Sequence, residues 1–310
     1  MKRILFLVSV VALAVVSCNK KDLPSVDVAA EDGLTEISFS VSEPETRATV
    51  VTSLSSVNVT ATKGTAETSV FENVAFTQAN GWKAGKYWPE QGAYTQNPYH
   101  FYASNAQMSL SGSNVTVTVS GVNASNALDV VCDYVATPVF QQTTTLTMHH
   151  ILAQVGYIKV LAPAGCTIEN LKIRLIPNYG GTYNLKNGAW TNTAAGTAFY
   201  LIGSAQSGVN ITTAGGSYQS TDRDLWLIPG NYTLTAEYTI WKGDYSESFV
   251  GNTAKTTSVN IQAGYNNNIV PSTDNGGNEQ PNFPDPTGAQ EITFSVSVEA
   301  WQTRDAVAQF

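Results

Sequence analysis

Charge is scarce in this 310-residue sequence: only 13% of the residues are Asp, Glu, Lys or Arg, and the formal net charge is −8. No basic stripe is present, so nucleic acid is not expected as a partner. The sequence also lacks a glycine-rich phosphate loop, a Gly-x-Ser-x-Gly motif and a Cys–His pattern typical of a nucleophile. Its carboxylates are scattered, and none pairs with another as an acid/base couple. We therefore expect a protein that is not an enzyme and needs no cofactor.

Histidine is almost absent, with three residues in the whole chain. His149 and His150 are neighbours, and on a strand adjacent side chains point to opposite faces, so they are poor joint ligands for one metal. We expect no metal site, and a half-buried His150 with its hydrogen bonds satisfied. The three cysteines are equally sparse. Cys132 and Cys166 are consistent either with a disulfide in an oxidising compartment or with two buried free thiols.

Long apolar runs are missing except at the N-terminus, where residues 4–16 follow Lys2 and a second basic residue. The run is too short to span a bilayer and is typical of a secretory signal. The sequence Val15-Val16-Ser17-Cys18 fits a bacterial lipobox, in which Cys18 is acylated and becomes the new N-terminus. The alternative is an ordinary signal peptide followed by an incidental cysteine. We predict a lipoprotein signal peptide over residues 1–17.

Long amphipathic helices are also hard to find, whereas short alternating runs separated by turn residues recur along the chain. This pattern predicts an all-β fold of two β-sandwich domains in tandem, over residues 48–148 and 149–270. Residues 271–290 contain four Pro and three Gly without apolar periodicity, which indicates a linker.

One short sequence occurs almost twice, near the two ends of the chain. Residues 36–42 (EISFSVS) and 291–297 (EITFSVS) differ only by Thr for Ser. Each copy alternates apolar and polar residues, so each predicts a strand with one buried face. The apolar positions are Ile37, Phe39 and Val41 in the first copy, and Ile292, Phe294 and Val296, extended by Val298, in the second.

Two interchangeable strands allow one subunit to lose its own strand and accept the other from a neighbour, as in strand-exchange polymers. The alternative is that sheet-rich chains reuse similar strands by chance. Between the first copy and the next strand-like run lies a polar stretch that contains Pro44 and Arg47. Arg47 is either an ordinary surface residue or a cleavage site for a protease that cuts after arginine, before Ala48.

Six aromatic residues gather within a short part of the first predicted domain. Exposed aromatic rings could stack on sugars, which suggests a monomeric surface lipoprotein that binds glycans. The alternative is that they fill the core of the domain, because Trp and Tyr bury large areas. The six residues are Trp82, Tyr87, Trp88, Tyr94, Tyr99 and Tyr102.

Several phrases in order resemble the fimbrillin family, the lipoprotein pilins of Bacteroidota. The resemblance spans the whole chain, and it is the order of the phrases, not any single one, that is specific. The phrases are Thr46-Arg47-Ala48, Gly81-Trp82, Tyr87-Trp88-Pro89, Phe101-Tyr102-Ala103, Asp133-Tyr134-Val135-Ala136, His150-Ile151-Leu152-Ala153-Gln154-Val155, Gly181-Thr182-Tyr183-Asn184-Leu185, Leu227-Ile228-Pro229 and Val298-Glu299-Ala300-Trp301. Gln154 departs from the lysine usual in the family.

The resemblance implies a pilus subunit of two transthyretin-like β-sandwiches, carried to the outer membrane by a lipid on Cys18. An arginine-directed protease would then remove the leader, residues 18–47, with its first strand. The C-terminal strand of another copy, residues 291–310, would replace it. Implied partners are further copies, other fimbrial subunits and a host or bacterial surface receptor. A removable first strand together with a donor strand favours a stalk subunit over an anchor or a tip.

Overall fold

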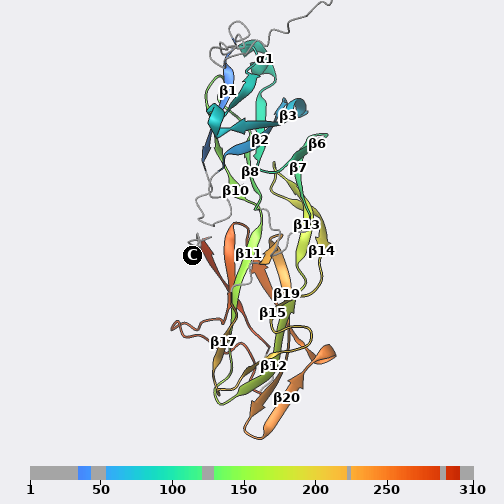
Figure 1. Ribbon diagram of the computed structural model, residues 1–310, viewed down its shortest axis with the longest axis vertical. Helices are drawn as coiled ribbons and strands as arrows, with labels where there is room; N and C mark the ends of the chain where they lie inside the picture. Colours follow the sequence, from blue (N-terminus) through green and yellow to red (C-terminus); the bar gives the residue numbers. More distant parts are fainter. Residues whose placement is uncertain (1–33, 43–53, 121–128, 222–224, 287–290, 301–310) are drawn as a thin grey trace, which may run out of the picture.

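The computed structural model describes residues 34–42, 54–120, 129–221, 225–286 and 291–300. Their regular structure is almost entirely β-strand, which confirms the all-β prediction. The molecule is elongated, with an upper and a lower half (Figure 1). The short helices are α1 (Gln91–Gln96), η1 (Gln78–Asn80) and η2 (Gly251–Thr253). Among the described residues, no helix has the length and apolar character needed to span a membrane.

The upper half is built on an eight-stranded sheet with the order β10-β8-β5-β2-β3-β4-β1-β9. Its strands are β1 (Glu36–Ser42), β2 (Ser56–Lys63), β3 (Thr68–Thr77), β4 (Lys83–Tyr87), β5 (Tyr99–Ser104), β8 (Val131–Val135), β9 (Thr144–Thr147) and β10 (His149–His150). Inward side chains of these strands, with those of three residues next to the strands, form one cluster, here called the first core: Ile37, Phe39, Leu54, Val57, Val59, Ala61, Phe71, Phe76, Trp88, Tyr99, Phe101, Ala103, Val131, Leu146 and Met148.

The lower half consists of two sheets. One has the order β17-β11-β22-β23, with β18 also paired to β11; the other has the order β15-β12-β19-β20, with β16 and β21 on its inner strands. The first contains β11 (Ala153–Leu161), β17 (Ser217–Gln219), β18 (Leu225–Leu227), β22 (Tyr265–Val270) and β23 (Ser295–Ala300). The second contains β12 (Thr167–Leu175), β15 (Phe199–Ile202), β16 (Val209–Ile211), β19 (Gly230–Lys242), β20 (Tyr245–Phe249) and β21 (Lys255–Ile261).

Apolar side chains from both lower sheets form a second core. Strand β19 alternates almost perfectly, with every second side chain from Tyr232 to Ile240 buried. From β11, Val155, Ile158 and Val160 are fully buried in the same cluster. This alternation is what one buried and one solvated face of a sheet require.

A four-stranded sheet joins the two halves. Its order is β14-β13-β7-β6, and its strands are β6 (Met108–Ser111), β7 (Asn114–Val119), β13 (Asn178–Asn184) and β14 (Trp190–Ala195). Strand β7 comes from the first predicted domain and β13 from the second, and they pair antiparallel over four residues. Main-chain hydrogen bonds therefore cross the boundary that the sequence placed between 148 and 149 (Figure 1).

The segment predicted as a linker is packed over part of its length. Asn282 is fully buried and Phe283 is 3% exposed. The Phe283 ring contacts Tyr238 of the second core, with 4.7 Å between ring centroids. Thr273 and Glu279 form an isolated antiparallel bridge. Residues 281–286 thus pack against the lower half, whereas residues 273–279 are exposed. The prediction of a freely flexible linker is therefore wrong for residues 281–286.

Candidate functional site

The first copy of the repeated sequence forms β1, which lies between β4 and β9 (blue in Figure 1). It pairs antiparallel with β4 near its start, where Ser38 lies opposite Lys83. From Phe39 onward it pairs with β9 in parallel, with Ser40 opposite Thr145. Removing β1 would therefore uncover the edges of two strands, and unpaired edges invite pairing with another chain.

The inward face of β1 is part of the first core. Ile37 is fully buried and Phe39 is 3% exposed. The Phe39 ring makes edge contacts with Phe76 and Phe101, at centroid distances of 4.8 and 5.0 Å. Val41 packs against the same cluster and is partly buried. The three residues that the sequence singled out in this copy thus lie together on one face, as the alternation predicts.

The outward face of β1 makes polar contacts that local sequence patterns do not reveal. The Glu36 carboxylate accepts a hydrogen bond from the backbone N–H of Gly85 at 2.9 Å, and its other oxygen lies 3.6 Å from the Lys83 ammonium. The hydroxyl of Ser38 is hydrogen-bonded to that of Thr143 at 2.9 Å. These contacts attach β1 to both of its neighbours through side chains as well as backbone.

The second copy lies in the lower half of the same chain. Its last residues belong to β23 (dark red in Figure 1), an edge strand that pairs antiparallel with β22, from Val270 opposite Ser295 to Tyr265 opposite Ala300. Ile292 is 2% exposed, and Phe294 and Val296 pack against the second core. Val298 lies opposite Asn267 in the same ladder.

The two copies differ in where the strand begins. The first is a strand from Glu36, whereas the second is a strand only from Ser295. Before that point, the backbone of Thr293 is bonded to Asn282: its N–H donates to the carbonyl of Asn282 at 3.0 Å, and its carbonyl accepts from the Asn282 side chain at 2.9 Å. Asn282 also exchanges hydrogen bonds with Leu161 at the end of β11.

Three other residues predicted from the sequence, Cys18, Arg47 and Ala48, lie outside the described residues. Lipidation and cleavage at these positions therefore stay predictions.

Three of the six aromatic residues considered as a sugar-binding surface are buried inside the protein. Trp88 is 1% exposed, Tyr99 is 6% exposed and Tyr102 is fully buried, while Trp82, Tyr87 and Tyr94 are partly buried. The Trp88 ring contacts four other aromatic rings, among them Tyr99 and Phe101. Packing, and not an exposed stacking surface, accounts for the three buried rings.

The titratable residues do not assemble a catalytic or metal centre within the described part of the chain, where no group of three His, Cys, Asp or Glu could hold a metal ion. His149 is exposed, and His150 is buried with its Nδ1 2.7 Å from the Asp129 carboxylate. Cys132 and Cys166 are free and buried, so they do not form the disulfide that the sequence left open. Burial raises the pKa of the Cys132 thiol to about 12, so this thiol is unreactive at neutral pH.

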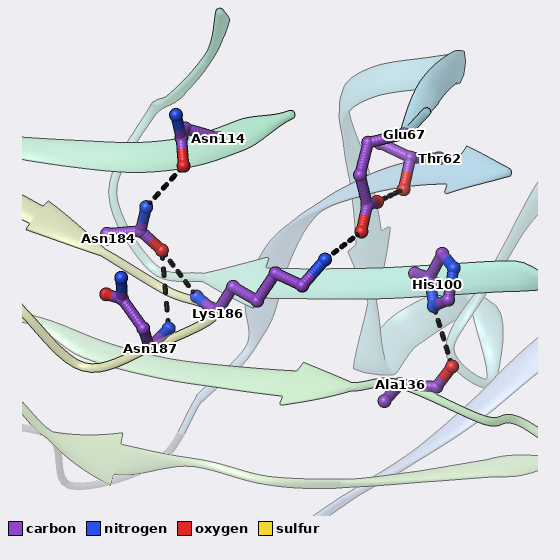
Figure 2. Close-up of polar contacts among 8 residues, drawn as sticks. All are labelled: Thr62, Glu67, His100, Asn114, Ala136, Asn184, Lys186 and Asn187. Carbon is purple, nitrogen blue, oxygen red and sulfur yellow. Dashed lines mark hydrogen bonds and ion pairs between the residues drawn. The ribbon is translucent and has the colours of Figure 1, made fainter. Parts of the chain in front are cut away.

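A buried carboxylate joins the two halves and was not found from the sequence. Glu67, in the turn between β2 and β3, has a fully buried side chain, and Lys186, after β13, reaches it at 2.6 Å (Figure 2). The Thr62 hydroxyl donates to the other carboxylate oxygen. Burial by itself raises the pKa of Glu67, but the bonds from Lys186 and Thr62 outweigh it and hold that pKa below its usual value.

The chain is similar to several solved bacterial proteins. A crystal structure described as a candidate cell adhesion protein from Bacteroides ovatus shares 14% identity, covering 88% of this chain and 99% of that one, with a TM-score of 0.41. Another, from Parabacteroides distasonis, shares 11% identity over 87% and 100% of the two chains, with a TM-score of 0.39. No protein with a curated description matches. A family model described as fimbrillin-like matches residues 46–301, most of the sequence, and the chain therefore belongs to the fimbrillin-like family.

Proposed function

We propose that this chain is a stalk subunit of a cell-surface fimbrium, which polymerises by exchanging one β-strand between copies. The precursor is an outer-membrane lipoprotein acylated on Cys18. An arginine-directed protease cuts after Arg47 and frees residues 18–47 with β1. The tail of another copy, residues 291–300, then enters between β4 and β9. The role is structural and requires no catalysis and no cofactor.

The observation that carries this proposal is the place of β1 in the first core. Burying an Ile, a Phe and a Val is worth about 5–9 kcal/mol from their transfer out of water. A subunit without β1 would lose that burial and leave two strand edges unpaired. It is therefore expected to bind the next strand of suitable pattern, and the chain itself supplies such a strand at its other end.

In this proposal β1 occupies the acceptor position until cleavage and so prevents early polymerisation. The donor strand is stored meanwhile as β23 on its own lower half. Exchange releases Ile292, Phe294 and Val296 from the second core and buries them in the first core of another copy. Because the inserted strand matches the lost one in six of seven residues, the new interface repeats contacts already present in the precursor.

We also propose that the two halves are tandem transthyretin-like sandwiches, with the sheet β14-β13-β7-β6 fixing their relative position. The competing function, a monomeric glycan-binding lipoprotein, needs exposed aromatic rings. The burial of Trp88, Tyr99 and Tyr102 speaks against that use for three of the six. A receptor on host or bacterial cells remains compatible with a stalk subunit, and other fimbrial subunits would be its partners in the fibre.

The test is truncation of the tail. A chain ending at residue 289 is expected to be exported and cleaved but to form no ladder of polymers on a gel of unheated surface material. A chain ending at residue 300 keeps the donor strand and serves as the matched control. Ladders from the shorter chain, at the level of the control, would show that residues 291–300 are not the donor.

A further inference from the structure

We infer that Glu291 fixes the register of the inserted strand, by binding Lys83 and the backbone N–H of Gly85 in the accepting copy. This inference rests on the proposed strand exchange. In it, one residue of the donor strand and two residues of the accepting copy determine how the inserted strand is aligned. Its starting point is the polar contact that Glu36 makes at the start of β1, where one oxygen accepts from Gly85 and the other faces Lys83.

The apolar alternation of the donor does not exclude every shifted register. In the expected register, Ile292, Phe294 and Val296 take the places of Ile37, Phe39 and Val41. A shift of one residue would turn the apolar side chains outward and is excluded by burial. A shift of two residues keeps the same face inward, because Val298 continues the alternation.

Only one direction of the two-residue shift keeps apolar side chains at all three inward positions. It would place Phe294, Val296 and Val298 at the three inward positions, all of them apolar. The shift in the opposite direction would place Gln290 where Ile37 lies, which buries an amide in an apolar core. The register problem therefore reduces to two alternatives, the aligned strand and one shifted strand.

Polar contacts separate these two alternatives. In the aligned register, Glu291 takes the place of Glu36, and Thr293 takes the place of Ser38 with its hydroxyl kept for the bond to Thr143. In the shifted register, Thr293 stands where Glu36 was, so Lys83 and the Gly85 N–H face no carboxylate. Ser38 and Thr293 are the one pair of residues that differs between the two copies, and both carry the hydroxyl that bonds Thr143 in the aligned register.

The expected size of this preference is modest. The Lys83 and Glu36 side chains are 51% and 28% exposed, and exposed ion pairs are weak and screened by salt. A change of sign at residue 291 replaces attraction by repulsion, and we expect it to move the ratio of aligned to shifted strands by about fivefold. The apolar side chains favour the same register, because the shifted strand would place Val296 where Phe39 contacts Phe76 and Phe101, and the polar contacts add to that preference.

The experiment reads the register with cysteine pairs in the full-length chain. Ser40 lies opposite Thr145, so Thr145→Cys with Ser295→Cys is expected to cross-link neighbouring copies in the aligned register. Thr145→Cys with Ser297→Cys reports the shifted register. Disulfides between chains appear as ladders of heated material on a non-reducing gel, where polymers held only by strand exchange fall apart, and the native Cys132 and Cys166 are buried.

With wild-type Glu291 we expect ladders mainly from the 295 pair. Glu291→Lys is expected to shift the ratio toward the 297 pair by about fivefold, with a smaller effect at high salt. Glu291→Gln keeps an oxygen for Gly85 and should have a weaker effect, whereas Lys83→Glu combined with Glu291→Lys should restore the wild-type ratio.

Two results would overturn the inference in different ways. An unchanged ratio in the Glu291→Lys chain, with ladders still present, removes the register role and leaves strand exchange intact. If neither cysteine pair gives ladders in the chain with wild-type Glu291 and Lys83, strand exchange itself fails and the register role fails with it.

Discussion

At the scale of single residues, Glu67 is the most demanding group in the described structure. It is a buried carboxylate, 1% exposed, with backbone φ of 54°, a left-handed conformation that non-glycine residues seldom adopt. Burying a charge is costly unless it is paired and hydrogen-bonded. Lys186 and Thr62 provide that compensation (Figure 2). The Tyr102 hydroxyl also lies nearby, and burial and the Glu67 charge both raise its pKa.

The pH dependence of stability follows from the lowered pKa of Glu67. A carboxylate with a lowered pKa in the folded state stabilises that state above its unfolded pKa, about 4.3, and loses this contribution as the pH falls through the folded value. We expect Glu67→Gln to lower the free energy of unfolding at pH 7 by about 1–3 kcal/mol and to flatten its decline below about pH 4.5. Urea unfolding at pH 7 and at pH 3.5 measures both. If the free energy of unfolding falls equally between pH 7 and pH 3.5 in the wild type and in Glu67→Gln, Glu67 does not have this role.

At the scale of elements, the two copies of the repeated sequence lie in different environments. As β1 it pairs on both sides and lies in the first core, whereas as part of the tail it forms an edge strand with a single partner, β22. Asn282 fixes the tail ahead of that strand by bonding both Leu161 and Thr293. Detaching β23, the proposed donor strand, therefore requires breaking side-chain hydrogen bonds in addition to a β-ladder.

Replacing Asn282 by Ala should loosen the tail. The substitution removes an acceptor from Leu161 and a donor from Thr293, each worth about 1–3 kcal/mol when a buried partner is left unsatisfied. We expect amide hydrogens of β23 to exchange at least about tenfold faster, which is what about 1.4 kcal/mol corresponds to. Hydrogen exchange by mass spectrometry measures this, with Asn275→Ala, an exposed position of the same segment, as control. Unchanged exchange in β23 would show that Asn282 does not hold it.

The sequence predicted these elements where the pattern is local. Alternation from Glu36 to Ser42 was sufficient for β1 and for its buried face. The later start of the second strand was not predictable, because it depends on Asn282, which lies 11 residues away along the chain. Phe283 was missed because its neighbours are Pro, Asn and Asp, which indicate a loop even when one aromatic side chain is buried.

At the scale of the whole molecule, the two halves are continuous. The β7–β13 pairing and the Glu67–Lys186 ion pair both connect them, the latter across 119 positions of sequence. Local patterns carry no information on such distant partners, which is why the sequence placed a simple boundary at 148/149. A subunit joined in this way is expected to transmit tension along a fibre through paired strands.

In the proposed mechanism, cleavage after Arg47 affects the molecule as a whole, because it determines whether β1 stays. Arg47→Ala is expected to leave a lipidated monomer with β1 in place, since the leader cannot be released. Gel analysis of unheated surface material measures this, and Arg174→Ala, at a position in β12, is the control for loss of another arginine. Polymer ladders from the Arg47→Ala chain would exclude Arg47 as the processing site.

The most direct test is a cryo-electron microscopy structure of the assembled fibre. We predict that residues 291–297 of one copy lie between β4 and β9 of the next, with Phe294 between Phe76 and Phe101, and that β1 is gone. If instead every copy retains β1 in its first core and β23 on its own β22, the chain does not polymerise by strand exchange.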